Sequence, residues 1–376
     1  MKNKFLLFAM LFICACSTLP TSYKDKSLNT LIQKPEFNYK ISYLPKLINI
    51  YFFYEEEKGT IPQEIQGFIS NSYFYNKKIS YRPKLLLSPL KTTECNIKNS
   101  KEDLIIVFNL SKNAANRTQL DCIKGLPKTK TLYVSNFEND LGFNNNFIVS
   151  REEEKSKLIE QIMDSTIRFV VIDSKNSTDK ENIKRLLEKN KKEVLDIKTY
   201  EDGYSSQDLF MEVLMVNRSN ERLRRISRRI GQNIVGESRP REDLDSFFFS
   251  VSLHEARNLK PALDYLSDKD FDIFILNSWE TNDTYKLIDK DMNGSFHSDF
   301  PIMMPIDMPK HIADDKKSRE FAIGYDTFEI ILLKYGGINL NNYTYKGLSG
   351  EIDPQSDKIL RSAHVFKIAN DVIEVL

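Results

Sequence analysis

The sequence predicts an α/β protein with two doubly wound parallel-sheet lobes joined by a hinge. The first observation is a pair of apolar runs, at residues 246–251 and 272–276, which flank a helix-period segment at 252–266. Such a pattern is typical of a β-α-β unit, whose parallel strands are buried on both faces. The second observation is that strand-like and helix-like segments alternate in two series, one from residue 48 and one from near residue 147. Each series predicts one sheet covered by helices.

The length and the charge balance agree with this class. A chain of 376 residues that is 41% hydrophobic can bury a full core and is long for one compact domain, so two lobes are expected. Its 54 basic and 53 acidic residues give a net charge of +1, which argues against nucleic acid as the main partner. The histidines are well separated, so the sequence predicts no metal site and no cofactor; they are His254, His297, His311 and His364.

The first 15 residues predict a signal peptide. Lys2 and Lys4 precede an apolar segment at 5–13, which ends in small residues immediately before Cys16. This pattern resembles a bacterial lipoprotein signal and predicts cleavage before Cys16, with a diacylglyceryl group on its sulfur. An ordinary secretory signal cut elsewhere is the alternative. Ser17 after the cysteine favours sorting to the outer membrane, and residues 16–44 are expected to form the lipidated cysteine and a polar tether.

Two cysteines remain in the mature body. An exported protein lies in an oxidising compartment, so Cys95 and Cys122 are candidates for a disulfide. Two buried free thiols are the alternative, because the sequence does not show whether the Cα atoms come within bridging distance.

The first lobe is expected at residues 45–142 and the second at 143–301. Alternation of apolar residues predicts strands of the first lobe at 48–54, 84–87, 104–108 and 131–136, with a helix at 63–75. In the second lobe the pattern predicts helices at 151–164, 178–190 and 206–230, strands at 168–173 and 193–197, and then the β-α-β unit. Ser150 and Glu153 have the spacing of a capping box at the first of these helices.

The chain is then expected to return to the first lobe at 302–345, with a helix at 318–334. A hairpin pattern over residues 346–376 is assigned to the second lobe. Because ligands of open parallel sheets bind at the carboxyl ends of the strands, the cleft between the lobes is the expected place for a site.

Several motifs resemble one known family. Arg239-Pro-Arg-Glu-Asp-Leu-Asp245, His254-Glu-Ala-Arg-Asn-Leu-Lys-Pro261 and Asp291-Met-Asn-Gly294 with Asp299-Phe-Pro301 look like the LppC-type lipoproteins, which activate class A penicillin-binding proteins. Gly347-Leu-Ser-Gly350 is a further match. The resemblance implies a type I periplasmic-binding-protein fold, anchored at the periplasmic face of the outer membrane. It also implies that the protein stimulates peptidoglycan synthesis by docking onto a 1A-type penicillin-binding protein.

Motifs for enzymes or metals are incomplete in this sequence. Ser88-Pro-Leu-Lys91 and Ser177-Thr-Asp-Lys180 fit S-x-x-K, but no K-T-G follows, so chance matches are the simpler interpretation. The segment 289–294 copies the first half of an EF-hand loop, but the position of the bidentate glutamate is Phe300, which favours an ordinary polar turn. We therefore predict no catalytic residue and no metal ligand.

An arginine cluster precedes the β-α-β unit. The helix predicted at 206–230 carries an aliphatic stripe of Leu223, Ile226 and Ile230, by which we expect it to pack. The candidate docking residues surround that stripe; they are Arg222, Arg224, Arg225, Arg228 and Arg229. They would suit an acidic protein surface or anionic glycan strands. A solvated helix face with acidic neighbours is the alternative.

A different class of function is also open, that of a solute-binding lipoprotein of a transporter for amino acids or peptide-like solutes. It requires polar groups that converge in the cleft between the lobes. Four residues at or near the carboxyl ends of predicted strands are candidates, although capping or packing is the simpler role for each; they are Asn136, Asp173, Asn277 and Tyr325.

Overall fold

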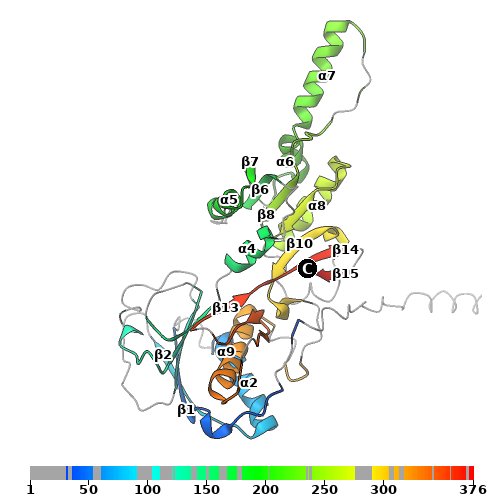
Figure 1. The fold of residues 1–376 in the computed structure, drawn as a ribbon. Helices are drawn as coiled ribbons and strands as arrows, with labels where there is room; N and C mark the ends of the chain where they lie inside the picture. Colours follow the sequence, from blue (N-terminus) through cyan, green and yellow to red (C-terminus); the bar gives the residue numbers. More distant parts are fainter. Residues whose placement is uncertain are drawn as a thin grey trace, which may run out of the picture.

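Two mixed, mostly parallel sheets form two lobes (Figure 1). The computed structural model describes residues 31–32, 36–53, 61–90, 104–110, 121, 123–136, 142–149, 152–160, 167–175, 180–201, 203–233, 236, 239–275, 290–304, 309–312, 317–340, 343–355, 357–369 and 372–376. The predicted fold class is confirmed.

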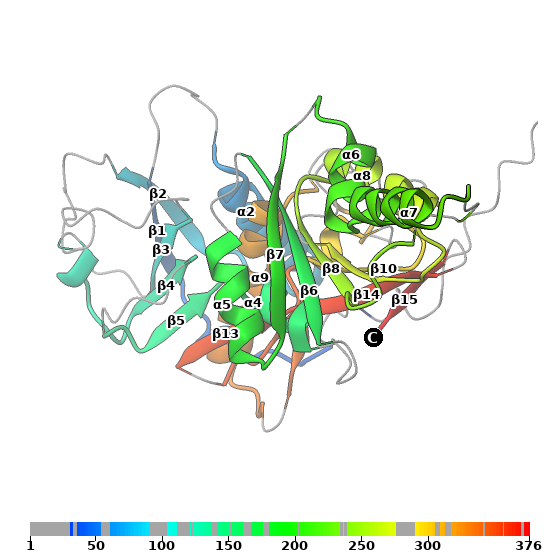
Figure 2. The same ribbon diagram turned by 90° about the horizontal axis from the view of Figure 1, so that it is seen from above.

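The first sheet has the strand order β11-β12-β13-β5-β4-β3-β1-β2. From β13 to β2 all neighbours are parallel, and β11, β12 and β13 pair antiparallel. The strands are β1 (Leu47–Phe53), β2 (Lys84–Leu90), β3 (Leu104–Asn109), β4 (Thr131–Ser135), β5 (Asn145–Ile148), β11 (Tyr345–Lys346), β12 (Glu351–Ile352) and β13 (Lys358–Ser362). Helices α2 (Gln63–Ile79) and α9 (Arg319–Tyr335) lie side by side on this lobe (Figures 1 and 2).

The second sheet has the order β15-β14-β10-β9-β8-β6-β7, parallel from β10 to β7 and antiparallel at β14 and β15. Its strands are β6 (Arg168–Ser174), β7 (Glu193–Tyr200), β8 (Ser246–Ser250), β9 (Asp272–Ile275), β10 (Ser295–Asp299), β14 (His364–Ala369) and β15 (Val372–Val375). Figure 2 shows α4 (Glu152–Glu160) and α5 (Lys180–Lys189) on one side, with α6 (Ser206–Val213) and α8 (Leu253–Leu266) on the other.

Strand β8 shows why this sheet is covered on both faces. Phe247 and Phe249 point into the core under α6 and α8, whereas Phe248 points into the core under α4 and α5. Alternation along a strand sends neighbouring side chains to opposite faces, so an unbroken apolar run needs helices on both. The β-α-β unit is confirmed, and α8 begins with a capping box between Ser252 and Glu255.

The pairing of the strands differs from the expected lobe boundaries in two places. Residues 145–148 and 345–362 pair in the first sheet, whereas the expected division put 143–148 and 346–362 in the second lobe. The reason is that β13 adds to β5 in parallel. Only the last two strands, β14 and β15, form the hairpin of the second sheet. The described chain therefore crosses between the sheets after β5, after β10 and between β13 and β14.

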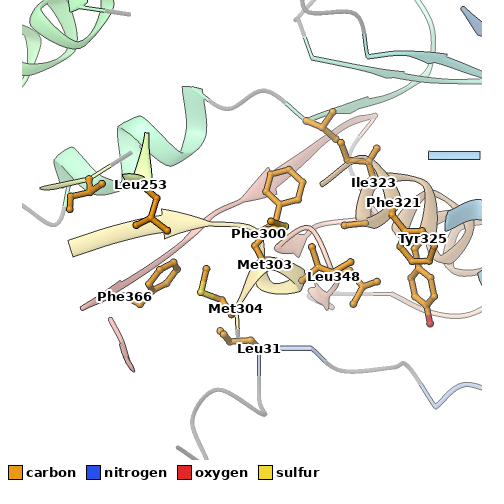
Figure 3. Close-up of a cluster of buried hydrophobic side chains, with 14 of the residues drawn as sticks. Leu31, Leu253, Phe300, Met303, Met304, Phe321, Ile323, Tyr325, Leu348 and Phe366 are labelled. Atoms are coloured by element: carbon orange, nitrogen blue, oxygen red, sulfur yellow. The ribbon is translucent and has the colours of Figure 1, made fainter. Parts of the chain in front are cut away.

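A buried apolar cluster joins the two lobes at these crossings. The short helix η6 (Pro301–Met303) lies there, and the N–H of Ile302 donates to the carbonyl oxygen of Leu348 at 3.1 Å. Figure 3 shows Phe300 and Met303 between side chains of both lobes, with Leu31 beside Met304. Side chains of both lobes therefore share one close-packed core where the chain crosses between them.

One long helix over 206–230 was predicted, and this is wrong. The chain forms α6 and then α7 (Val216–Ile230), with Met215 in the left-handed region at φ 57° between them. The carbonyl oxygen of Leu214 accepts the N–H of Arg241 at 2.9 Å, which replaces a helical hydrogen bond. The chain changes direction there, and α7 projects from the second lobe (Figure 1).

Candidate functional site

The residues predicted for the cleft lie on different elements of the two lobes. The Asn136 side chain donates to the carbonyl oxygen of Leu110 at 2.9 Å, so it ties the end of β4 to the end of β3. Asp173 is 1% exposed in β6 of the other sheet. Asn277 lies outside the described residues. Asn136 therefore links the ends of β3 and β4, in agreement with the capping role that was the simpler expectation for it.

Tyr325 lies in the helical layer of the first lobe. It is 1% exposed on α9, and its hydroxyl is 2.9 Å from Nε2 of His311. The Asn71 side chain of α2 donates to its carbonyl oxygen at 3.0 Å. Burial raises the pKa of the Tyr325 hydroxyl well above its usual value. Its role is packing between α2 and α9.

The motif Gly347-Leu-Ser-Gly350 binds the carboxylate of Asp326 on α9. Asp326 is completely buried, and Oδ2 accepts from the N–H and the hydroxyl of Ser349 at 2.7 and 2.6 Å. Oδ1 accepts from the N–H of Leu348 at 3.0 Å and the hydroxyl of Tyr345 at 3.1 Å. A Cβ at Gly347 would lie 2.5 Å from Oδ2. The motif therefore holds the β11–β12 turn onto α9.

We expect the free energy of unfolding to depend on pH through the buried carboxyl group of Asp326. Burial raises its pKa from 3.8 to about 6, against the lowering effect of the hydrogen bonds from Ser349, Leu348 and Tyr345. A raised pKa means that the folded state binds the proton more tightly, so this stabilisation is present below pH 3.8 and is lost as pH rises through 6. The free energy of unfolding of wild type minus that of Asp326→Asn should fall by roughly 2 to 3 kcal/mol between pH 4 and pH 7.

The measurement is urea unfolding of both proteins at several pH values. Subtracting the variant removes the contribution of every other titrating group. A difference that rises with pH would contradict the prediction, because it would mean that the four donors keep the carboxylate ionised.

Strand β10 carries a serine, a histidine and an aspartate on one face, a set that the sequence reasoning missed. Ser295, His297 and Asp299 alternate along the strand, and the Ser295 hydroxyl is 2.6 Å from Nε2 of His297. The same hydroxyl donates to the carbonyl oxygen of Met292. All three residues are 0% exposed, and burial lowers the His297 pKa to about 3. The set is a core polar cluster.

Asp299 forms a bidentate ion pair across the lobes. Nε and Nη2 of Arg319 donate to its two carboxylate oxygens at 2.7 and 2.5 Å. The Asp299 side chain is 0% exposed and that of Arg319 is 19% exposed. Asp299 ends β10 of the second sheet, whereas Arg319 begins α9 of the first lobe. The pair therefore fastens one lobe to the other.

The EF-hand-like segment forms a turn in its described part. Residues 290–292 form a short 3-10 helix, and Gly294 has φ 86° with its N–H donating to the carbonyl oxygen of Ile368 at 2.7 Å. Across the residues that the structure describes, no group of three or more His, Cys, Asp or Glu could hold a metal ion. Ser88, from the first S-x-x-K pattern, donates to Oδ1 of Asn49 at 2.9 Å; Ser177 lies outside the described residues, as do Cys16, Cys95 and Cys122.

Helix α7 carries the five predicted docking arginines, and they are exposed. The expected packing of its aliphatic stripe is wrong, because Val216 is the only residue of the helix that is buried. Ile226 is 37% and Ile230 57% exposed. The reason is the break at Leu214 and Met215, which takes the helix away from the sheet before its stripe can reach it.

The charges of α7 are mostly unbalanced. Arg225 pairs with Glu221 at 3.3 Å, and both side chains are largely exposed. In the described part of the chain no carboxylate forms an ion pair with the four other candidates, which are Arg222, Arg224, Arg228 and Arg229. Of the five candidates, Arg225 is the one for which the described part of the chain supplies an acidic partner.

A groove runs along α7 and has a volume of about 970 Å³. One wall is the helix, and the other is the segment that returns towards β8. Its apolar lining includes Met215, Leu223, Ile226 and Pro240. Its charged lining is Arg218, Arg222, Arg239 and Arg241, together with the carboxylate of Asp268. Sequence reasoning missed Arg218 and Arg239. Arg218 lies four residues before Arg222, so the helical period places both on the same face of the helix. This spacing could have identified Arg218 from the sequence.

A second, more open pocket of about 560 Å³ lies beside the carboxyl end of β7, between α6 and α8. Tyr200, Ser206 and Arg257 are among its lining residues, and the hydroxyls of Tyr200 and Ser206 are 3.3 Å apart. Neither this pocket nor the groove contains any of the predicted cleft residues. Among the described helices, none combines the length and the apolar character that crossing a membrane requires.

The fold is similar to that of three solved structures. Full-length LpoA from Haemophilus influenzae matches with a TM-score of 0.59 and 12% identity, over 94% of this chain and 62% of that one. The C-domain of LpoA from the same organism, described as a regulator of PBP1A, matches with a TM-score of 0.56 and 12% identity, over 88% of this chain and 99% of that one. A putative branched-chain amino acid ABC transporter from Rhodospirillum rubrum matches with a TM-score of 0.56 and 11% identity, over 89% of this chain and 100% of that one.

These matches show a periplasmic-binding-protein-like fold. No match was found among the curated proteins. The family model described as LppC putative lipoprotein matches residues 155–358, which is more than half of the chain and includes the β-α-β unit, α7 and the Asp326 cluster. The chain therefore belongs to the LppC family of lipoproteins.

Proposed function

We propose that this protein is a lipid-anchored regulator of peptidoglycan synthesis at the periplasmic face of the outer membrane. It binds a class A penicillin-binding protein of the 1A type and activates it by protein contact. The observation that carries the proposal is the combination of LppC membership with a fold similar to nearly the whole LpoA C-domain, which is described as a regulator of PBP1A. The lipid anchor on Cys16 belongs to the proposal and follows from the signal pattern of the first residues.

The chemistry of the described residues supports a role without catalysis. The Ser295 and His297 pair is closed inside the core, where a substrate does not reach it. Asp326 and Asp299 are each occupied by partners that join one element to another. A regulator of this kind needs a stable body that presents a surface, and these buried polar contacts supply the stability.

The test of binding uses the full mature chain and a purified class A synthase from the same organism. We expect the immobilised chain to capture the synthase with a Kd in the micromolar range or tighter, as is common for transient regulatory contacts. A cytoplasmic protein of matched size and charge serves as the control. The proposal fails if the synthase and the control are captured to the same extent.

Calorimetry separates this function from that of a solute-binding lipoprotein. Titration of the full chain with amino acids and with muropeptides should give no saturable heat, because the Asn136 side chain is hydrogen-bonded to Leu110 and Tyr325 is buried against His311. Saturable binding of one of these solutes at micromolar concentration would favour the solute-binding function instead.

A further inference from the structure

The groove along α7 has the features of a binding site for a protein segment. Its lining is mainly apolar and cationic: Leu223 and Ile226 of α7 and Pro240 of the returning segment supply apolar side chains, and Arg218, Arg222 and Arg239 supply positive charge. Asp268 adds one carboxylate to the lining. A groove of this composition selects a ligand that is apolar on one side and anionic on its edges.

The two walls of the groove are fixed to each other at its base. The N–H of Arg241 donates to the carbonyl oxygen of Leu214 at 2.9 Å, and the N–H of Arg239 donates to Oγ of Ser219 at 3.0 Å. Arg241 is also held by Asp243, with two contacts of 2.6 Å. A preformed groove loses little conformational entropy when it binds, which favours a specific ligand over diffuse attraction.

The charge of the groove is available for a partner. Among the described residues, no carboxylate forms an ion pair with Arg222 or Arg239. An arginine fork binds a carboxylate through two parallel hydrogen bonds, so glutamates and aspartates on a partner match these groups. The concave shape favours a rod-like segment over a flat bilayer. With only Ile226 and Ile230 exposed on the stripe, α7 also offers little apolar area for insertion into lipid.

We propose that this groove binds an acidic amphipathic segment of a partner protein. Apolar side chains of the segment rest on Leu223 and Ile226, and its carboxylates pair with Arg218, Arg222 and Arg239. Of the five arginines that the sequence offered as docking residues, only Arg222 lines the groove. By the helical period, Arg224 and Arg228 lie on the opposite side of α7 from Arg222 and serve as a matched control. The proposed binding of an acidic segment does not depend on the synthase being the partner protein.

The test measures binding of a labelled synthetic peptide by fluorescence anisotropy with the full chain. The peptide is a helix with leucines at spacings of three and four and with glutamates beside them; its twin has lysine in place of every glutamate. We expect the wild-type chain to bind the glutamate peptide and not the lysine peptide. Arg222→Glu/Arg239→Glu should weaken binding by at least about tenfold, and Arg224→Glu/Arg228→Glu, with the same change in charge, by less than about twofold.

Several results would overturn the proposal. One is that the wild type does not bind the glutamate peptide, and another is that the two double variants lose binding equally, which would show diffuse electrostatics. A third is that vesicles of phosphatidylglycerol bind the chain through the same arginines and the peptide does not compete. Melting curves of both variants, whose substituted side chains are exposed, confirm that each is folded.

The same variants tested with the synthase separate this inference from the proposed function. Loss of synthase binding in Arg222→Glu/Arg239→Glu alone supports the groove and identifies the synthase as the source of the segment. If the wild type binds the peptide through the groove but does not bind the synthase, the proposed function fails and the groove stands. Synthase binding that is insensitive to the groove variant, together with no peptide binding, overturns the groove and leaves the proposed function in place.

Discussion

Arg319→Ala should lower the free energy of unfolding by about 3 to 5 kcal/mol. The substitution removes the bidentate ion pair with Asp299, whose side chain is completely buried at the end of β10. Removing one partner of a buried pair leaves a carboxylate in a medium that solvates charge poorly, and this costs more than the pair contributes. Because Arg319 begins α9, the loss should also loosen the contact between the lobes.

Equilibrium unfolding in urea measures this loss of stability, and two further variants serve as comparisons. Arg319→Lys keeps the charge and loses the planar fork, so its loss should be clearly smaller. Arg225→Ala removes an exposed pair with Glu221 and should leave the unfolding curve unchanged. If the unfolding curve of Arg319→Ala coincided with that of the wild type, the ion pair would not stabilise the contact between the lobes.

Gly324→Ala should destabilise the protein by at least about 3 kcal/mol, although alanine is the better helix former. A Cβ at residue 324 would overlap the carbonyl oxygen of Glu64 and lie 2.9 Å from its Cα. From the other side, a Cβ at Gly67 would overlap the carbonyl oxygen of Phe321. Main-chain atoms cannot turn aside as a side chain can, so α2 and α9 would have to separate.

The stability of Gly324→Ala is measured by thermal and urea unfolding. The control variant is Asn217→Ala, at an exposed position of α7. The control should be close to wild type, because it changes helix propensity by a few tenths of a kcal/mol and removes no buried contact. Stabilisation by Gly324→Ala would contradict the close approach of the two helices.

The β-α-β unit and the helix of the return segment could be predicted because their local signals agree with their tertiary roles. The apolar run at residues 246–250 is buried on both faces, and Ser252 and Ser318 accept the first-turn N–H groups of α8 and α9. Where pattern, cap and packing all favour one structure, the sequence is sufficient. The mostly parallel two-lobe architecture follows from such segments.

The break between α6 and α7 had no local signal. No glycine or proline stands at Leu214 or Met215, and the aliphatic stripe continues to Ile230. At the break the carbonyl oxygen of Leu214 accepts a hydrogen bond from Arg241, which comes from a later part of the chain. Pairing of β13 with β5 has a similar cause, because a strand pattern shows that a strand exists and does not show which edge it joins.

Only part of the candidate site could be predicted, because the rest of it also depends on contacts between distant parts of the chain. The arginine cluster was visible in the sequence, but the groove depends on the direction that α7 takes after Met215 and on the return of Arg239 and Pro240 beside it. Tyr325 was misplaced because α9 is buried almost all round, so no face of it marks a cleft.

The most direct test of the central claim is the rate at which a purified class A synthase polymerises glycan strands, with and without the full mature chain. The account predicts a severalfold higher rate at saturating chain, and no product from the chain incubated alone with the lipid-linked precursor. An unchanged rate in the presence of the chain, or product formed by the chain alone, would contradict it.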